Sequence, residues 1–134
     1  MIMLAVHFIG DFLFQSNWMA LNKSRRVLPL LAHVSAYTAA FVPMALALFP
    51  QAHHMVGFLL LTFGLHVLVD AVTSRITQAL WFVDLERCDS VIRQDGFPYW
   101  VSFNDIKRHW FFVVIGFDQL LHAACLAWAY TVFA

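Results

Sequence analysis

Histidine and aspartate recur together inside the apolar parts of this chain. Three pairs are spaced four residues apart, and one more histidine lies in a further apolar run: His7 with Asp11, His66 with Asp70, Asp118 with His122, and His33 alone. A spacing of four places two side chains on one face of a helix. Imidazole and carboxylate are ligands for borderline divalent ions such as zinc, iron and manganese.

A bound cation would explain how carboxylates are tolerated among apolar residues. On insertion scales, each aspartate at the centre of a membrane helix costs roughly 2.5 to 3.5 kcal/mol. A divalent ion would neutralise these carboxylates and offset that cost. We therefore expect seven metal ligands: His7, Asp11, His33, His66, Asp70, Asp118 and His122. Asp11 and His33 are also the candidates for acid–base catalysis.

The number of ligands bears on the number of ions. Seven ligands exceed what one tetrahedral zinc can use, so we expect one or two divalent ions, zinc first, with iron or manganese as alternatives. Polar neighbours can orient metal-bound imidazoles, and we assign this role to Gln15, Ser74 and Gln119. Two other interpretations stay open, namely a purely structural polar network and a path for protons or ions.

The segments that carry these residues have the composition of a membrane protein. The chain of 134 residues is 62% hydrophobic and 12% charged, whereas soluble domains carry about 25% charged residues. Apolar runs cover residues 1–20, 27–49, 54–73 and 110–133, and each is near the length of about 20 residues that crosses a bilayer. The sequence predicts a single all-α domain, a bundle of four transmembrane helices. Counted along those helices, the candidate ligands fall in one band about 13 Å deep.

The basic residues predict the orientation of this bundle. All eight lie between the first and second or the third and fourth apolar runs. The positive-inside rule then places these connections in the cytoplasm and both termini outside, in a bacterial inner membrane. The polar stretch 84–107 is expected to form a short interfacial loop on the cytoplasmic face. Arg25, Arg26, Arg75 and Arg108 could bind an anionic headgroup there.

Several sequence blocks resemble a known family. His7-Phe-Ile-Gly-Asp11-Phe-Leu-Phe-Gln15 and the later His66-Val-Leu-Val-Asp70 and Asp118-Gln119-Leu-Leu-His122 resemble an uncharacterised, domain-of-unknown-function family of small bacterial and phage membrane proteins. The resemblance covers essentially the whole chain and implies a small polytopic membrane protein. More distantly, the layout is similar to that of inner-membrane metal-dependent hydrolases, through spaced His and Asp in short helices.

These features favour a membrane-embedded, metal-dependent hydrolase. Its substrate would be a membrane lipid, a lipid-linked phosphate or another amphiphile reached from the cytoplasmic leaflet. A transporter or channel for metal ions or protons, a di-iron oxidoreductase and an interaction protein with a structural polar network are the alternatives. The formal net charge of zero gives no support for a nucleic-acid partner. Small residues such as Ala39, Ala40, Ala123 and Ala124 would allow a homodimer.

Overall fold

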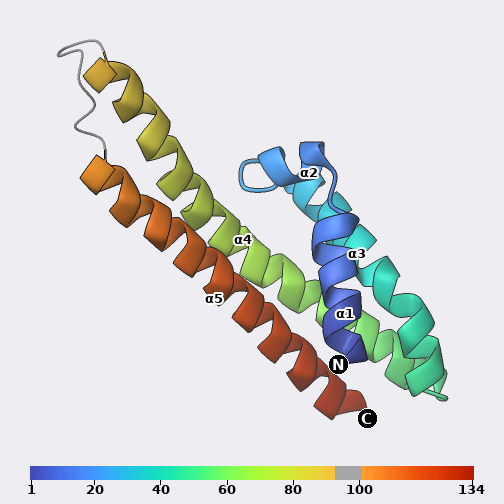
Figure 1. Cartoon of the computed structure of the whole chain (residues 1–134). Coiled ribbons are helices and arrows are strands. Elements are labelled where there is room, and N and C mark those ends of the chain that lie inside the picture. Colours follow the sequence, from blue (N-terminus) through green and yellow to red (C-terminus); the bar gives the residue numbers. More distant parts are fainter. Residues whose placement is uncertain (93–100) are drawn as a thin grey trace.

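The described part of the chain is helical throughout. The computed structural model describes the backbone of residues 1–92 and 101–134 and the side chains of residues 1–80 and 109–134. Its elements are α1 (Ile2–Phe8), the π-helical turn η1 (Ile9–Leu13), α2 (Asn17–Asn22), α3 (Val27–Leu48), α4 (Ala52–Ile92) and α5 (Val101–Phe133) (Figure 1). These residues contain no strand, which confirms the all-α prediction.

Three helices, not four, are long and apolar enough to cross a membrane. They are Val27–Leu48, Ala52–Leu80 and His109–Phe133. The expectation that residues 1–20 form a fourth span is wrong, because the first apolar helix covers only Ile2–Leu13. The helix breaks because Ser16 is the N-cap of the separate helix α2. Its hydroxyl oxygen accepts a hydrogen bond from the backbone N–H of Met19. About 12 helical residues rise only about 18 Å, well short of about 30 Å of hydrocarbon.

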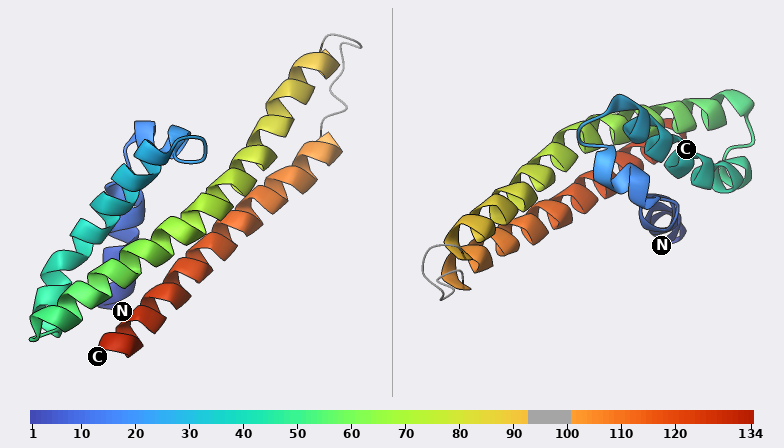
Figure 2. Two further views of the ribbon diagram at one scale, coloured as in Figure 1. Left: turned by 180° about the vertical axis from the view of Figure 1, so that it is seen from behind. Right: turned by 90° about the horizontal axis from the view of Figure 1, so that it is seen from above.

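The short first segment nevertheless closes the bundle. α1 and η1 contact α3, α3 contacts α4, α4 contacts α5, and α1 contacts α5, which makes a ring of helical elements. The views in Figures 1 and 2 agree that α4 lies between α3 and α5. Both termini lie at the same end of the molecule as the turn between α3 and α4 (Figure 1). The polar side chains of the four elements therefore face one shared interior.

The α4–α5 hairpin is longer than the hydropathy pattern predicts. α4 continues to Ile92 and α5 begins at Val101, so much of the backbone expected to be a loop over residues 84–107 is helical. The reason is that hydropathy marks only the part of a helix suited to lipid, and polar residues continue a helix without difficulty. The turn expected at Gly96-Phe97-Pro98 lies outside the described residues.

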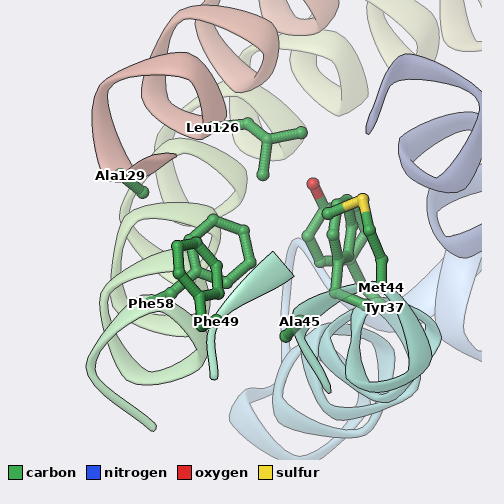
Figure 3. Packing of buried hydrophobic residues seen from close by; sticks show 8 residues of the cluster. Tyr37, Met44, Ala45, Phe49, Phe58, Leu126 and Ala129 are labelled. Atoms are coloured by element: carbon green, nitrogen blue, oxygen red, sulfur yellow. The ribbon is translucent and has the colours of Figure 1, made fainter. Parts of the chain in front are cut away.

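An apolar cluster fills the bundle at the end that carries the termini. α3 contributes most of it, with Phe58 from α4 and Leu126 and Ala129 from α5 (Figure 3). The rings of Phe49 and Phe58 lie 5.1 Å apart, centroid to centroid. Tyr37 lies at the inner edge of this cluster, with its ring stacked on His66 at 3.8 Å. The apolar cluster thus covers the polar residues from this side.

Candidate metal centre

Four buried side chains from η1, α3 and α4 converge on one point. They are Asp11, His33, His66 and Asp70. His33 Nε2 lies 3.1 Å from Asp11 Oδ1 and 3.2 Å from Asp70 Oδ2. His66 Nε2 lies 3.5 Å from Asp11 Oδ1 and 3.6 Å from Asp70 Oδ2. The two imidazole Nε2 atoms lie 3.3 Å apart.

These separations have the size of the edges of a metal tetrahedron. Zinc binds histidine nitrogen and carboxylate oxygen at about 2.0 to 2.2 Å, so the edges of its tetrahedron are about 3.3 to 3.6 Å long. Five of the six edges of the cluster are given above, and they run from 3.1 to 3.6 Å. Each carboxylate oxygen therefore lies, from both imidazole nitrogens, at the spacing found between ligands of one metal ion.

Hydrogen bonding alone accounts poorly for this arrangement. Ionised carboxylates carry no proton, and each neutral imidazole carries only one. Nδ1 of both His33 and His66 lacks a hydrogen-bond partner among the described residues. At most two protons are then available for five close contacts, and lone pairs are left facing one another. A divalent cation at the centre satisfies all four donors at once.

Lys23 balances part of the negative charge. It follows α2, and its Nζ lies 2.9 Å from Asp70 Oδ2. Its neighbour Ser24 donates a hydrogen bond to Gln78 on α4. In the sequence, Lys23 was interpreted only as one of the basic residues that indicate the orientation of the protein in the membrane. The signal that could have revealed its second role is its place at the end of an apolar segment, from which a long side chain can reach inward.

Gln119 connects the centre to α1 and α3 through a chain of hydrogen bonds with a fixed direction. Its amide nitrogen donates to Asp11 Oδ2 at 2.7 Å and to Asp118 Oδ2 at 3.1 Å. Because both acceptors are carboxylates, the amide oxygen must face the other way, where His7 Nε2 lies 3.0 Å from it. His7 Nε2 is then the donor, and Nδ1 accepts from the Tyr37 hydroxyl at 3.0 Å. His7 therefore orients Gln119 and contacts none of the four converging donors at the distances described.

Asp118 and His122, on α5, lie beside the four converging side chains. The Thr73 hydroxyl, which sequence reasoning missed, donates to Asp118 Oδ1 or to the Val69 carbonyl. The ring of His122 stacks on that of His66 with a centroid distance of 4.1 Å. The donor atoms of Asp11, His33 and His66 lie close enough together to hold a metal ion. Two further sets that include His122 also do so. One combines it with His66 and Asp70, and the other combines it with Asp11 and Asp118.

The π-helical turn brings Asp11 close to α3. A π-turn widens the helix by one residue and is frequently found at functional sites. Gly10 permits the close packing of this turn: a Cβ atom there would lie 3.0 Å from the Tyr37 ring and 3.3 Å from the Tyr37 Cα. The sequence pattern predicted that Asp11 lies in a helix on the same face as His7, but it did not predict this π-helical turn.

A pocket of about 410 Å³ lies between the carboxylates and α2 with the basic connection that follows α2. Asp11, Asp70, Asp118 and Lys23 are its charged lining residues. Other polar residues lie along its walls, namely Gln15, Ser24, Thr73, Ser74, Thr77, Gln78 and Gln119. Its apolar lining is Phe12, Ala20, Leu21, Phe111 and Ile115. The pocket could hold a polar group next to the carboxylates and an apolar group near its mouth.

The remaining predicted residues occupy varied positions. Ser74 donates its hydroxyl hydrogen to the backbone carbonyl of Asp70, not to an imidazole. Gln15 is half-buried in the pocket wall. Arg25, Arg26 and Arg75 are exposed and do not belong to the residues that line the pocket. The side chain of Arg108 lies outside the described residues.

The comparisons with known proteins identify the family and no activity. A family model described as a protein of unknown function (DUF3307) matches residues 1–134, so the chain belongs to this family. The match confirms the resemblance to a domain-of-unknown-function family. No curated protein and no solved structure matches the chain.

Proposed function

We propose that this member of the DUF3307 family is an integral membrane protein that holds a divalent metal ion between Asp11, His33, His66 and Asp70. The observation that carries the proposal is a set of five separations of 3.1 to 3.6 Å, which join the two imidazole nitrogens to each other and to one oxygen of each carboxylate. Two nitrogen and two oxygen donors favour zinc, with iron or manganese as alternatives. Asp11 and His33 then act as ligands and not as the acid–base pair that the sequence suggested.

Charge supports the same proposal. Asp11, Asp70 and Asp118 carry three negative charges when ionised and Lys23 carries one positive charge, which leaves two negative charges. One divalent ion neutralises this group of residues, which would otherwise be costly inside a bilayer. Removal of the ion would leave paired carboxylates in a poorly solvated interior.

The pocket supports hydrolysis of an amphiphilic substrate as the reaction. In hydrolysis, a metal ion makes a water molecule nucleophilic near neutral pH and polarises the bond to be cleaved. Lys23, Ser24 and Gln78 offer hydrogen-bond donors to a polar headgroup, whereas Phe12, Leu21 and Phe111 offer an apolar surface to an acyl or prenyl chain. We propose a lipid or lipid-linked phosphate or ester that enters from the leaflet next to the basic connections.

The apolar cluster favours an enzyme over an ion channel. Beyond His66 and Tyr37, the interior toward the termini is filled by side chains such as Phe49, Phe58 and Leu126 (Figure 3). An ion leaving the centre in that direction would lose its ligands and its water. The polar pocket opens on the opposite side, as expected for a site that admits and releases its ligand through one mouth.

Elemental analysis tests metal binding. Protein purified gently in detergent is expected to contain at least one transition-metal ion per chain, and both His66→Ala and Asp70→Asn should lower this content by at least one ion. His53→Ala, which changes an exposed histidine in the first turn of α4, should leave it unchanged. A metal content near zero in the wild type, or full content in His66→Ala, would show that the proposal is wrong.

Turnover needs a separate test. Wild-type protein is expected to hydrolyse p-nitrophenyl phosphate, p-nitrophenyl esters or a phospholipid in mixed micelles, and to lose this activity on chelation. Zn²⁺ supplied together with Mn²⁺ should restore the activity in the wild type but not in His66→Ala. If metal-loaded protein is inactive on all three classes of substrate, the proposed hydrolase activity is wrong, whereas the proposed metal site is unaffected.

A further inference from the structure

We propose a second, weaker cation site next to the first, formed by His122, Asp118 and the two carboxylate oxygens that are not ligands of the first site, Asp11 Oδ2 and Asp70 Oδ1. The inference rests on the proposed metal centre and extends it. The four proposed donors of the first site are all protein atoms, and four protein ligands would leave a tetrahedral zinc ion without an open position. A centre that acts on a substrate in the pocket needs a cation with a coordination position open to the pocket.

His122 is the first observation that points to this ligand. Its side chain is 2% exposed, and neither ring nitrogen has a hydrogen-bond partner among the described residues. Nδ1 lies 3.5 Å from Asp118 Oδ2 and Nε2 lies 3.9 Å from Asp70 Oδ1. A buried imidazole between two carboxylates, without a hydrogen bond to either, is costly unless another group completes it.

The carboxylates provide the second observation. Asp11 and Asp70 present Oδ1 and Oδ2, respectively, to His33 Nε2. Each therefore keeps its other oxygen for a neighbouring ion, and carboxylate-bridged ions in two-metal sites lie about 3.5 to 4 Å apart. Gln119 donates to Asp11 Oδ2 and to Asp118 Oδ2, but each carboxylate oxygen keeps a second lone pair.

The position of the second site fits the pocket. Asp11, Asp70 and Asp118 line the pocket, whereas His33 and His66 do not. The side chain of Asp118 is 16% exposed, compared with 2% for Asp70. An ion bound by Asp118 would therefore face the space where a substrate can lie, while the first ion remains enclosed.

The donors also select the kind of ion and its affinity. One imidazole and up to three carboxylate oxygens form a harder set than the two imidazoles and two carboxylates of the first site. Oxygen-rich sets suit Mn²⁺ and Mg²⁺. The first ion already neutralises the centre, so the second binds against less negative charge and should bind at least about tenfold more weakly.

Mn²⁺ titration of the zinc-loaded protein tests the second site. Full-length protein in detergent is loaded with one equivalent of Zn²⁺, and free Mn²⁺ is followed by its electron paramagnetic resonance signal. Zinc is silent in this measurement and manganese does not displace it, because it binds such sites more weakly. We expect one Mn²⁺ ion to bind per chain in the wild type and in the control His53→Ala, and none in His122→Ala.

Asp118→Asn is the second variant, because it keeps the size of the side chain. It should weaken Mn²⁺ binding at least tenfold and retain the Zn²⁺ equivalent, which also reports that the variant is folded. Free Mn²⁺ throughout the wild-type titration, or wild-type binding in folded His122→Ala and Asp118→Asn, would overturn the proposal. Stoichiometric Mn²⁺ binding without hydrolysis would leave the second site intact and remove the hydrolase instead.

Discussion

At the scale of single residues, the centre combines ligands that the sequence predicted with partners that it did not. The seven His and Asp residues could be grouped because each helix has a defined rise and a defined face. Distances between helices depend on side-chain packing and are not encoded in spacing. For this reason the sequence could not separate Asp11, His33, His66 and Asp70 from His7, Asp118 and His122.

Lys23 is expected to compete with the metal for Asp70. Its ammonium lies 2.9 Å from an oxygen of the proposed ligand set, and like charges repel more strongly in a poorly solvated site. Lys23→Met should therefore tighten Zn²⁺ binding by about threefold or more and destabilise the metal-free protein. Competition with a chromophoric chelator measures the affinity, and Arg26→Met, at an exposed position, is the control. Weaker zinc binding in Lys23→Met would contradict the assignment of Asp70 as a ligand.

Gln119 is expected to orient the ligands through its amide group. Gln119→Glu replaces the NH₂ group that donates to Asp11 and Asp118 with a carboxylate oxygen. This oxygen can only accept hydrogen bonds, as the two aspartate carboxylates do. Loss of such an orienting contact typically lowers metal affinity about 10- to 100-fold, and the same chelator competition measures it. Gln51→Glu, in the exposed turn before α4, should have no effect. An unchanged affinity in Gln119→Glu would mean that the hydrogen-bond chain to His7 and Tyr37 is only structural.

At the scale of elements, the close contact between η1 and α3 sets the position of Asp11. Gly10→Ala places a Cβ atom 3.0 Å from the Tyr37 ring and 3.3 Å from its backbone. The turn must then move away from α3, which should lower the free energy of unfolding by about 1 to 3 kcal/mol and weaken metal binding. Thermal denaturation in detergent and the metal content measure these effects.

Gly64 provides a matched control for Gly10. A Cβ atom at Gly64 meets nothing within 4 Å, and alanine is favoured over glycine inside a helix by roughly 0.5 to 1 kcal/mol. Gly64→Ala should therefore leave the stability equal or slightly higher. Equal behaviour of the two variants would indicate that the packing of η1 on α3 does not position the site.

The elements themselves were predictable where hydropathy and helix length coincide. α3 and the apolar parts of α4 and α5 lie close to the predicted runs. The prediction for the first run was wrong because the run stays apolar beyond Leu13, whereas a new helix, α2, begins after its N-cap Ser16. The predicted bounds of α4 and α5 were too short for the opposite reason. The residues up to Ile92 and from Val101 are helical, although they lack the continuous apolar pattern of a membrane span.

At the scale of the whole molecule, the proposed function requires one orientation in the membrane. The pocket opens toward α2 and the basic connections, which should face the cytoplasm. In a variant that lacks Cys88 and Cys125, Gln51→Cys is expected to react with an impermeant maleimide in intact cells. Asn17→Cys, at an exposed position on α2, should react only after permeabilisation. The reverse pattern would place the pocket on the outer face and contradict a substrate from the cytoplasmic leaflet.

The most direct test of the metal centre is X-ray absorption of protein loaded with one equivalent of Zn²⁺. Five separations among the four donors are 3.1 to 3.6 Å, so we expect four nitrogen and oxygen scatterers at about 2.0 to 2.1 Å. We also expect imidazole scattering from two histidines and the loss of this signature in His33→Ala. A sulfur ligand, a six-coordinate spectrum typical of hydrated ions, or an unchanged spectrum in His33→Ala would contradict the proposed metal centre.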